Sequence, residues 1–174
     1  MTQPASGPVE LTDPSPTWVT TFEHERDRLV RVLDDVLLEV HHIGSTAIEG
    51  IRAKPIVDII PVVTSLSQLD FNRDRVEVLG YAWWGEYGIA RRRFCTLQAA
   101  TTKRRLVNAH FFERGDPEIQ RHIGFRDYLR AHADVAREYE AIKLVAAAQH
   151  PNDVNLYNDA KAGWIQGIDK RVSR

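Results

Sequence analysis

Residues 41–46 read His-His-Ile-Gly-Ser-Thr, and they lead from an apolar-tending segment into a turn. A second apolar segment follows and carries Asp58 in its first half. In such an arrangement Gly44 allows backbone N–H groups to approach a phosphate closely, and the hydroxyl of Ser45 adds a donor. The carboxylate of Asp58 can bind Mg²⁺. These residue types, in this order, are compatible with a site that binds a phosphate group and a metal ion.

The phosphate ligands predicted from this pattern are the backbone amides of Gly44, Ser45 and Thr46, together with the Ser45 hydroxyl. Transfer of a nucleotidyl group requires that the triphosphate is positioned, that its charge is neutralised and that the attacking atom loses a proton. Two simpler interpretations stay open. The Gly-Ser pair could form an ordinary tight turn, and Asp58 could be a strand carboxylate paired with a nearby lysine or arginine.

Two histidines could add acid–base chemistry or metal ligation. Asn108 and His110 share one face of a predicted strand, so a site that combines them with Asp58 is geometrically possible. His42 lies beside the Gly-Ser turn, whereas His41 points to the opposite face. The candidate catalytic residues are therefore Asp58, His110 and His42, and the candidate metal ligands are Asp58 and His110. The alternative for both histidines is a hydrogen-bonded structural role.

A dispersed set of basic residues could supply positive charge to such a site. Its members are Lys54, Arg92, Arg126, Lys143 and Lys161. Arg126 and Lys161 lie among apolar residues at helical spacing, and a buried cation needs an anionic partner such as Asp58 or a bound phosphate. Arginine suits bidentate phosphate binding. Tyr157, one turn before Lys161, could stack on a base. The alternatives are solvated surface cations and a tyrosine that belongs to the core.

Several segments resemble the GrpB family, which was formerly catalogued as UPF0157 and is placed in the nucleotidyltransferase superfamily. The most specific match is the Gly-Ser turn with the strand that follows it, since residues 41–48 read HHIGSTAI and residues 54–59 read KPIVDI. The other matches extend along nearly the whole chain, at residues 18, 22, 25, 80–81, 91–94, 108–110, 125–130, 139, 143, 157 and 161.

The resemblance implies an α+β fold with a nucleotidyltransferase-like mixed β-sheet flanked by helices and a C-terminal helical subdomain. It also implies a nucleoside triphosphate as ligand and Mg²⁺ or Mn²⁺ as cofactor. The chain departs from the superfamily's Asp-x-Asp or Asp-x-Glu pair, because Ile60 stands where the second acid is expected. A two-metal centre needs several carboxylates around ions about 4 Å apart, and one strand aspartate does not build it. Many relatives have His-x-His where this chain has Asn108-Ala109-His110.

Three functions of different classes follow. The first is a nucleotidyltransferase-like enzyme that transfers a nucleotidyl or phosphoryl group from a nucleoside triphosphate to a small-molecule acceptor. The second is a non-catalytic domain that binds a nucleotide or another phosphate ligand, and the fusion of GrpB-like domains to dephospho-coenzyme A kinases fits that accessory role. The third is an enzyme that uses His110, His42 and Asp58 in the same cleft without a nucleotide. We favour the first.

Length, charge and cysteine content limit the class of protein. The 174 residues suffice for one domain with a sizeable core. We expect a disordered tail over residues 1–12, a sheet core over about 13–113 and a helical part over about 114–174. The net charge of −1 gives no global field for nucleic acid, and the basic-aromatic segment 83–94 divides its arginines between two strand faces. Cys95 is the only cysteine, which suits a cytoplasmic protein, and no apolar run could span a membrane.

The elements that must position these residues follow from periodicity. Helical spacing of apolar residues predicts a helix over residues 18–36 and another over 67–79, ended by Gly80. Strands are predicted over 37–43, 56–63, 81–97 and 106–112, with a turn or short helical piece over 44–50 and a polar, exposed connection over 101–105. Three C-terminal helices are predicted to begin at Asp116 with Pro117, at Asp134, and at Asn152 or Asp153.

Overall fold

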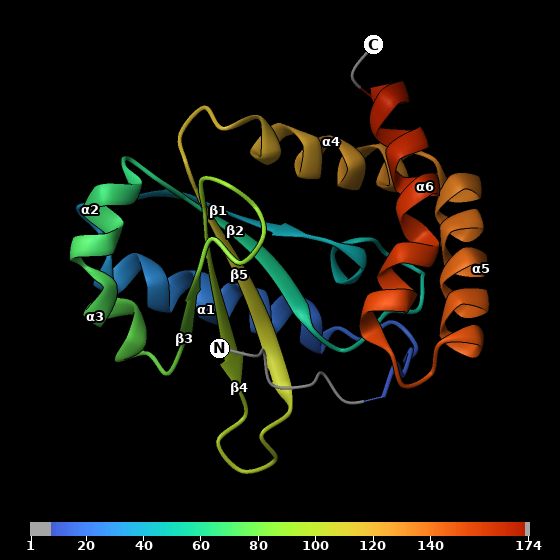
Figure 1. The fold of residues 1–174 in the computed structure, drawn as a ribbon, viewed down its shortest axis with the longest axis horizontal. Coiled ribbons are helices and arrows are strands. Elements are labelled where there is room, and N and C mark those ends of the chain that lie inside the picture. The colour runs from blue at the N-terminus through green and yellow to red at the C-terminus, as the bar shows by residue number, and fades with distance from the viewer. Residues whose placement is uncertain (1–7, 173–174) are drawn as a thin grey trace.

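The computed structural model describes residues 8–172 and contains one five-stranded sheet with helices around it (Figure 1). The strands are β1 (Leu37–Ile43), β2 (Val57–Val63), β3 (Ala82–Gly85), β4 (Arg92–Gln98) and β5 (Arg105–Glu113). The helices are α1 (Thr17–Val32), the 3₁₀ helix η1 (Ser45–Ala47), α2 (Leu66–Phe71), α3 (Arg73–Glu77), α4 (Pro117–Ala131), α5 (Ala133–Gln149) and α6 (Val154–Val172).

The sheet is mixed, with the strand order β1-β2-β5-β4-β3. Only β2 and β5 run parallel, and every other neighbouring pair is antiparallel. The predicted α+β fold with a mixed sheet flanked by helices is therefore confirmed. Strand β2 lies inside the sheet, and because both of its faces are covered its sequence is almost continuously apolar. The parallel register places Asp58 directly beside Asn108.

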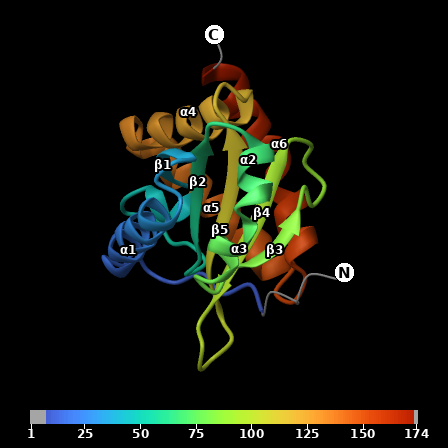
Figure 2. The ribbon, with the colours of Figure 1, turned by 90° about the vertical axis from the view of Figure 1, so that its left-hand side faces the viewer.

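Alternate side chains of the strands reach opposite faces of the sheet. One face is covered by α1, α2 and α3, as the side view shows (Figure 2). Leu29 of α1, Leu69 of α2 and Val76 of α3 belong to one buried cluster with Ile59 and Ala109. This cluster is the main core, and it fixes which residues of β2 and β5 are left to face the other side.

The opposite face is covered only in part. Ile60 and Phe112 pack against Ile119 of α4. Helices α5 and α6 stand side by side at one side of the sheet (Figure 1), where α5 contributes Tyr139 and α6 contributes Ile168 to a separate cluster with α4 and the segment after η1. Between these two clusters the face carries polar side chains. None of the helices within residues 8–172 combines the length and apolarity needed to cross a bilayer.

The helix starts follow capping rules for α4 and α6. The Asp116 carboxylate accepts a hydrogen bond from the Glu118 amide at 3.0 Å, and Pro117 occupies the first turn, as predicted. The Asp153 side chain accepts from two amides at the start of α6 at 2.9 and 3.0 Å. Helix α5 differs, because its N-cap residue is His132 and Asp134 lies in its first turn.

Two predicted elements are divided in the structure. The helix predicted over residues 67–79 is split into α2 and α3 at Asn72, whose side-chain amide donates to the Gln68 carbonyl at 2.8 Å and so competes with the helical ladder. The segment 81–97 forms the hairpin β3–β4, because Tyr87 and Arg91 adopt positive φ angles of 43° and 61° in the loop between them.

Two predicted boundaries also move. Helix α1 ends at Val32, four residues before the predicted end, although the apolar residues after it stay buried. Residues 1–7 of the expected tail lie outside the described residues. The rest of that segment packs against the fold: Val9 is buried and donates its amide to the Pro151 carbonyl at 2.7 Å, and Thr12 forms a β-bridge with Ala53.

Candidate functional site

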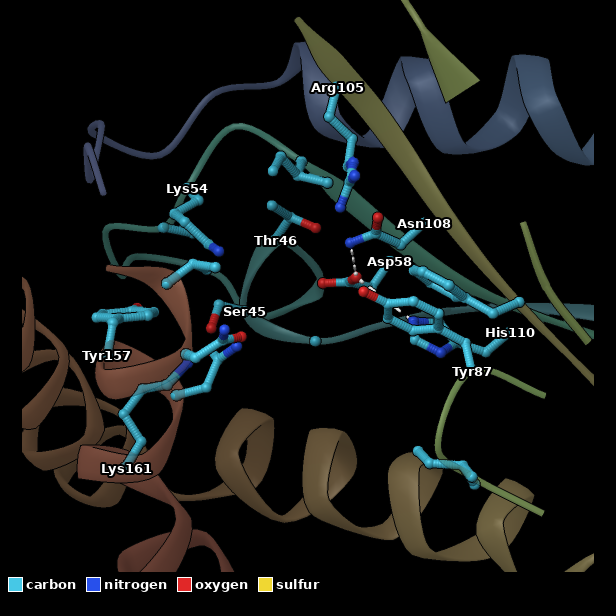
Figure 3. A pocket seen from close by; sticks show the side chains of 18 of the residues that line it. Ser45, Thr46, Lys54, Asp58, Tyr87, Arg105, Asn108, His110, Tyr157 and Lys161 are labelled. Carbon is cyan, nitrogen blue, oxygen red and sulfur yellow. Dashed lines mark hydrogen bonds and ion pairs between the residues drawn. The ribbon is translucent and has the colours of Figure 1, made fainter. Parts of the chain in front are cut away.

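A cleft of about 450 Å³ opens on the polar part of the sheet face, between η1, the β3–β4 loop and helices α5 and α6. Its charged lining consists of four cationic side chains and one carboxylate: Lys54, Arg92, Arg105, Lys161 and Asp58. Figure 3 shows the side chains from β2 and β5 on one side of this cleft and those from α6 on the other. The predicted Gly-Ser turn and the Asp58 strand therefore meet at one site.

Gly44 is required where the turn passes Asp58. Its φ angle is 69°, and a Cβ atom at this position would lie 2.7 Å from Asp58 Oδ2. Only glycine allows both the left-handed backbone and this close approach. The next residue, Ser45, donates its hydroxyl to the Tyr139 hydroxyl oxygen at 3.4 Å, and Thr46 lines the same cleft. The turn is thus packed directly against the carboxylate, as the two motifs together predict.

The Asp58 carboxylate is held by two side chains of β5. Asn108 Nδ2 donates to Asp58 Oδ1 at 2.8 Å, and His110 Nε2 lies 3.7 Å from the same oxygen. Ala109 between them belongs to the core on the other face, as strand alternation predicts. Burial alone would raise the pKa of the Asp58 carboxyl, but His110, Asn108 and Lys54 outweigh it and hold that pKa below its usual value. Asp58 is therefore ionised at neutral pH.

Arg92 fixes the orientation of His110 and of the loop above it. Its Nη1 lies 3.2 Å from His110 Nδ1, and because arginine only donates, this nitrogen accepts. Nε2 then carries the ring proton and faces Asp58. Arg92 also donates to the backbone carbonyls of Glu86 and Tyr87, the latter at 2.6 Å. One side chain thus connects the strand, the histidine and the β3–β4 loop.

Two lysines share one tyrosine ring at the α6 side of the cleft. The ammonium nitrogens of Lys161 and Lys54 lie 4.1 and 5.3 Å from the centre of the Tyr157 ring. Burial, with Lys54 and Lys143 nearby, lowers the pKa of Lys161 to about 7. Burial likewise lowers the pKa of Lys54. Among the described residues, neither lysine forms an ion pair with a carboxylate.

Arg105 is a residue of the cleft that the sequence did not predict. It stands at the first position of β5, and its Nε is buried without a hydrogen-bond partner, as is Oδ1 of Asn108. Counting by twos from Asn108 would place Leu106 in the cleft. The register slips between Leu97 and Gln98 on the neighbouring strand, however, so β5 has one extra residue and Arg105 takes that face. The position of Arg105 in the cleft depends on this bulge, and no residue pattern in the sequence indicates the bulge.

The β3–β4 loop adds an aromatic wall. The ring of Tyr87 stacks on Phe94 at 5.5 Å between centres, and Phe94 in turn contacts the His110 ring at 5.1 Å. Tyr87 is 41% exposed and lines the cleft. These aromatic residues come from the segment whose nucleic-acid character was discounted on charge. Their placement here indicates a flat apolar surface beside the charged part of the cleft.

Three predicted site residues lie outside the cleft lining. His42 is buried on the α1 side, where it stacks on Phe22 at 5.0 Å and bonds to the Thr46 hydroxyl at 2.9 Å, and burial above all lowers its pKa to about 4. Arg126 donates to the His42 carbonyl at 2.9 Å. Lys143 donates to the Arg52 carbonyl, with its pKa lowered to about 8 by burial. None of these three side chains therefore lines the cleft beside Asp58.

The donor set of the cleft does not fit a two-metal centre. Among the residues that the structure describes, Asp58 is the only carboxylate in its lining, and Ile60 is buried in the apolar cluster under α4. Within residues 8–172, no three His, Cys, Asp or Glu side chains are grouped so that they could hold a metal ion. Two-metal sites need carboxylates shared between both ions. The side chains that line this cleft therefore do not fit a two-metal mechanism.

The mixed sheet with its flanking helices is a nucleotidyltransferase-like fold. The fold is similar to that of the Cid1 poly(U) polymerase, solved with MgATP, with a TM-score of 0.52 and 14% identity over 76% of this chain and 42% of Cid1. At this identity the likeness concerns the fold alone.

The sequence profile of the GrpB protein family matches residues 8–171, so the chain belongs to the GrpB family, and the resemblance stated from the sequence is confirmed. The crystal structure of GrpB from Enterococcus faecalis has a TM-score of 0.86 and 32% identity, covering 94% of this chain and 96% of that one. The UPF0157 protein YqkA of Bacillus subtilis is 40% identical over 90% of this chain, which spans only 45% of YqkA. The glutamate-rich protein GrpB of Alkalihalophilus pseudofirmus is 34% identical, over 93% of this chain and 94% of that protein.

Proposed function

We propose that this chain binds a nucleoside triphosphate, or a closely related phosphorylated molecule, in the cleft beside Asp58. The observation that carries the proposal is the excess of cations in the lining, where four positive side chains face one carboxylate. Phosphate oxygens accept charge-assisted hydrogen bonds from lysine and arginine, which are about twice as strong as neutral ones. The Gly44–Ser45 turn adds backbone donors at the same place.

The two ends of the cleft suit the two parts of a nucleotide. Lys54 and Lys161 around the Tyr157 ring form the charged end. Tyr87 and Phe94 form the aromatic end, where an offset-stacked base would cover apolar ring surface. A phosphorylated ligand that also carries an aromatic base therefore fits this cleft better than a bare inorganic anion.

The test is calorimetric titration of the full chain with ATP, CTP, GTP, UTP and dephospho-coenzyme A. We expect at least one of them to bind, and Lys161→Met to weaken that binding about tenfold or more, the loss of one charge-assisted contact. Lys170→Met is the matched control, because Lys170 lies on the same helix, is exposed and does not line the cleft. Equal affinity of both variants, or no binding of any ligand by the wild type, would contradict the proposal.

Transfer of the nucleotidyl or phosphoryl group to a small acceptor is the second candidate function, favoured by the ionised Asp58 carboxylate at the wall of the cleft. Such a carboxylate could accept the proton of an attacking hydroxyl or amine. We expect Asp58→Asn to abolish release of pyrophosphate or phosphate from ATP in the presence of acceptor mixtures. ATP affinity of the variant should stay within about threefold of wild type. Equal turnover by both proteins would exclude Asp58 as the base.

A further inference from the structure

The cleft combines a nucleotidyltransferase-like fold with a lining that lacks the acids of a two-metal centre. The position two residues after Asp58 on the same strand face is occupied by Ile60, which is fully buried. The residue beside Asp58 on β5 is the neutral Asn108. In place of further carboxylates, this wall presents cations.

Three of these cations come from separate elements and interact with the charge of Asp58 without forming a direct ion pair with it. Lys54 precedes β2, Arg105 begins β5 and Lys161 lies on α6. Among the described residues none of the three takes part in an ion pair, and Arg105 Nε is buried with no acceptor. Partial burial makes the charged form of an unpaired side chain costly, and the pKa values of all three groups are lowered for this reason. All three are half-buried and line one cleft, so a single anion from solution can reach them, and its charge would favour their protonated forms.

We propose that Lys54, Arg105 and Lys161 neutralise the phosphates of the ligand in this cleft, so that its binding does not depend on a divalent metal ion. This inference rests on the proposed nucleotide-binding function. It adds that the nucleotide binds without a divalent metal ion. A metal-free triphosphate carries more negative charge than its magnesium complex. The three side chains therefore favour the metal-free form, because their ammonium and guanidinium groups supply positive charge that metal ions would otherwise supply.

The first experiment compares ATP binding by the wild type in excess EDTA with binding in excess MgCl₂. We expect affinity in EDTA to equal or exceed that in MgCl₂. Tightening by about tenfold or more on addition of Mg²⁺ would overturn the inference while leaving the proposed function intact. Absence of binding under both conditions would remove the proposed function and this inference together.

Three charge variants measure the contribution of each cation to binding separately: Lys54→Met, Arg105→Met and Lys161→Met. Each should weaken binding of ATP and of inorganic tripolyphosphate in EDTA by about tenfold or more, whereas Lys170→Met should not. Circular dichroism and urea unfolding show whether each variant is folded. Folded variants that all bind tripolyphosphate like the wild type would assign the three cations to the structure of the empty cleft and contradict the inference.

A gain-of-function variant tests the same idea from the opposite direction. Asn108 Nδ2 already touches Asp58 Oδ1 at 2.8 Å, so Asn108→Asp creates a pair of adjacent carboxylates. We expect this variant to bind Mn²⁺ alone at least about tenfold more tightly than the wild type, measured by electron paramagnetic resonance. Asn158→Asp adds the same charge to the cleft lining from α6 and is the control. Tight Mn²⁺ binding by the wild type itself would overturn the inference.

Discussion

Gly44 and Asp58 constrain each other sterically, because the glycine has no Cβ atom and so leaves room for a carboxylate oxygen of Asp58. In Gly44→Ala the new carbon would lie 2.7 Å from Asp58 Oδ2, and the backbone would keep its φ of 69°. We expect a loss of about 1–2 kcal/mol in the free energy of unfolding from the backbone alone, with a further loss from the displaced carboxylate. ATP affinity should fall as well, because the turn and Asp58 no longer fit together.

The matched control for this change is Gly50→Ala. Gly50 has a similar φ of 78°, but nothing lies within 4 Å of the position that its Cβ would take. Urea unfolding should therefore show the backbone cost in both variants and the additional loss only in Gly44→Ala. If the two variants were equally stable and bound ATP equally, the close approach of turn and carboxylate would have no energetic consequence.

Because of Lys161, the free energy of unfolding should depend on pH above pH 7. Its pKa is lowered to about 7, mainly by burial, and the groups that face it are Lys54, Lys143, Asp58 and the ring of Tyr157. In the unfolded chain a lysine keeps its usual pKa of about 10.4. Between these two values the unfolded state binds more protons than the folded state, so the free energy of unfolding rises with pH.

We therefore expect urea unfolding of the ligand-free protein to show increasing stability from about pH 7 to about pH 9.5. Lys143, with a pKa of about 8, contributes in the same direction, so Lys161→Met should reduce this rise without removing it. The conservative Lys161→Arg stays charged throughout and should also reduce it, with lower stability at high pH. A rise of the same size in all three proteins would show that Lys161 does not titrate in this range.

At the scale of elements, the alternation of side chains along a strand was the rule that predicted most about which residues face the site. It correctly placed Asn108 and His110 on one face and Ala109 on the other. Arg105 was expected in the exposed connection 101–105, whereas it is the first residue of β5, and a bulge opposite Gln98 turns it into the cleft. A bulge depends on pairing with a neighbouring strand, which local sequence does not specify.

Helical periodicity showed which cations are buried but could not show what they bind. Lys161 and Arg126 were both expected in the cleft because each lies in an apolar stripe. Lys161 lines the cleft, whereas Arg126 satisfies its guanidinium on a backbone carbonyl of β1. His42 was assigned to the cleft by its place beside the Gly-Ser turn, yet its strand position points it toward α1. The partners were settled by how α4 and α1 pack on the sheet, which is a property of tertiary structure.

Arg126 should therefore matter for stability and not for ligand binding. Its Nη1 bond to the His42 carbonyl joins α4 to β1, and its side chain is only 13% exposed. We expect Arg126→Met to lower the free energy of unfolding by about 1–3 kcal/mol, with ATP affinity unchanged. Arg26→Met is the control, because Arg26 pairs with the adjacent Asp27 at the surface and, within residues 8–172, forms no hydrogen bond or ion pair to another element. A selective loss of ATP affinity in Arg126→Met would place Arg126 in the binding site after all.

At the scale of the whole molecule, positive charge is concentrated where the sheet meets the C-terminal helices. The chain carries 23 lysines and arginines against 24 acids, so its net charge is −1. Four cations nevertheless line one cleft with one carboxylate. Helix α6 contributes both Tyr157 and Lys161 to that cleft, so the C-terminal helices are part of the binding site as well as a support for the sheet.

This distribution predicts binding of small anions without general affinity for nucleic acid. Binding to phosphate backbones by charge requires a basic surface that contacts many phosphates, and here the cations are confined to a cleft of about 450 Å³. We expect fluorescence anisotropy to show no binding of labelled single-stranded RNA below about 100 μM at physiological salt, the weak end of non-specific affinities. The nucleotide that binds best in calorimetry should bind under the same conditions.

If RNA did bind, the variant Lys161→Met would show whether it binds in the cleft. If RNA bound tightly and Lys161→Met abolished that binding, the strand end would be occupying the nucleotide cleft, and the acceptor would be a nucleic acid instead of a small molecule. If RNA bound equally well to wild type and Lys161→Met, the contact would lie elsewhere on the surface. In that case the affinity for RNA should fall steeply with added salt, as is typical of contacts to the phosphate backbone of a nucleic acid. Nucleotide binding should depend less on salt, because its cations lie in a partly enclosed site where screening is weaker.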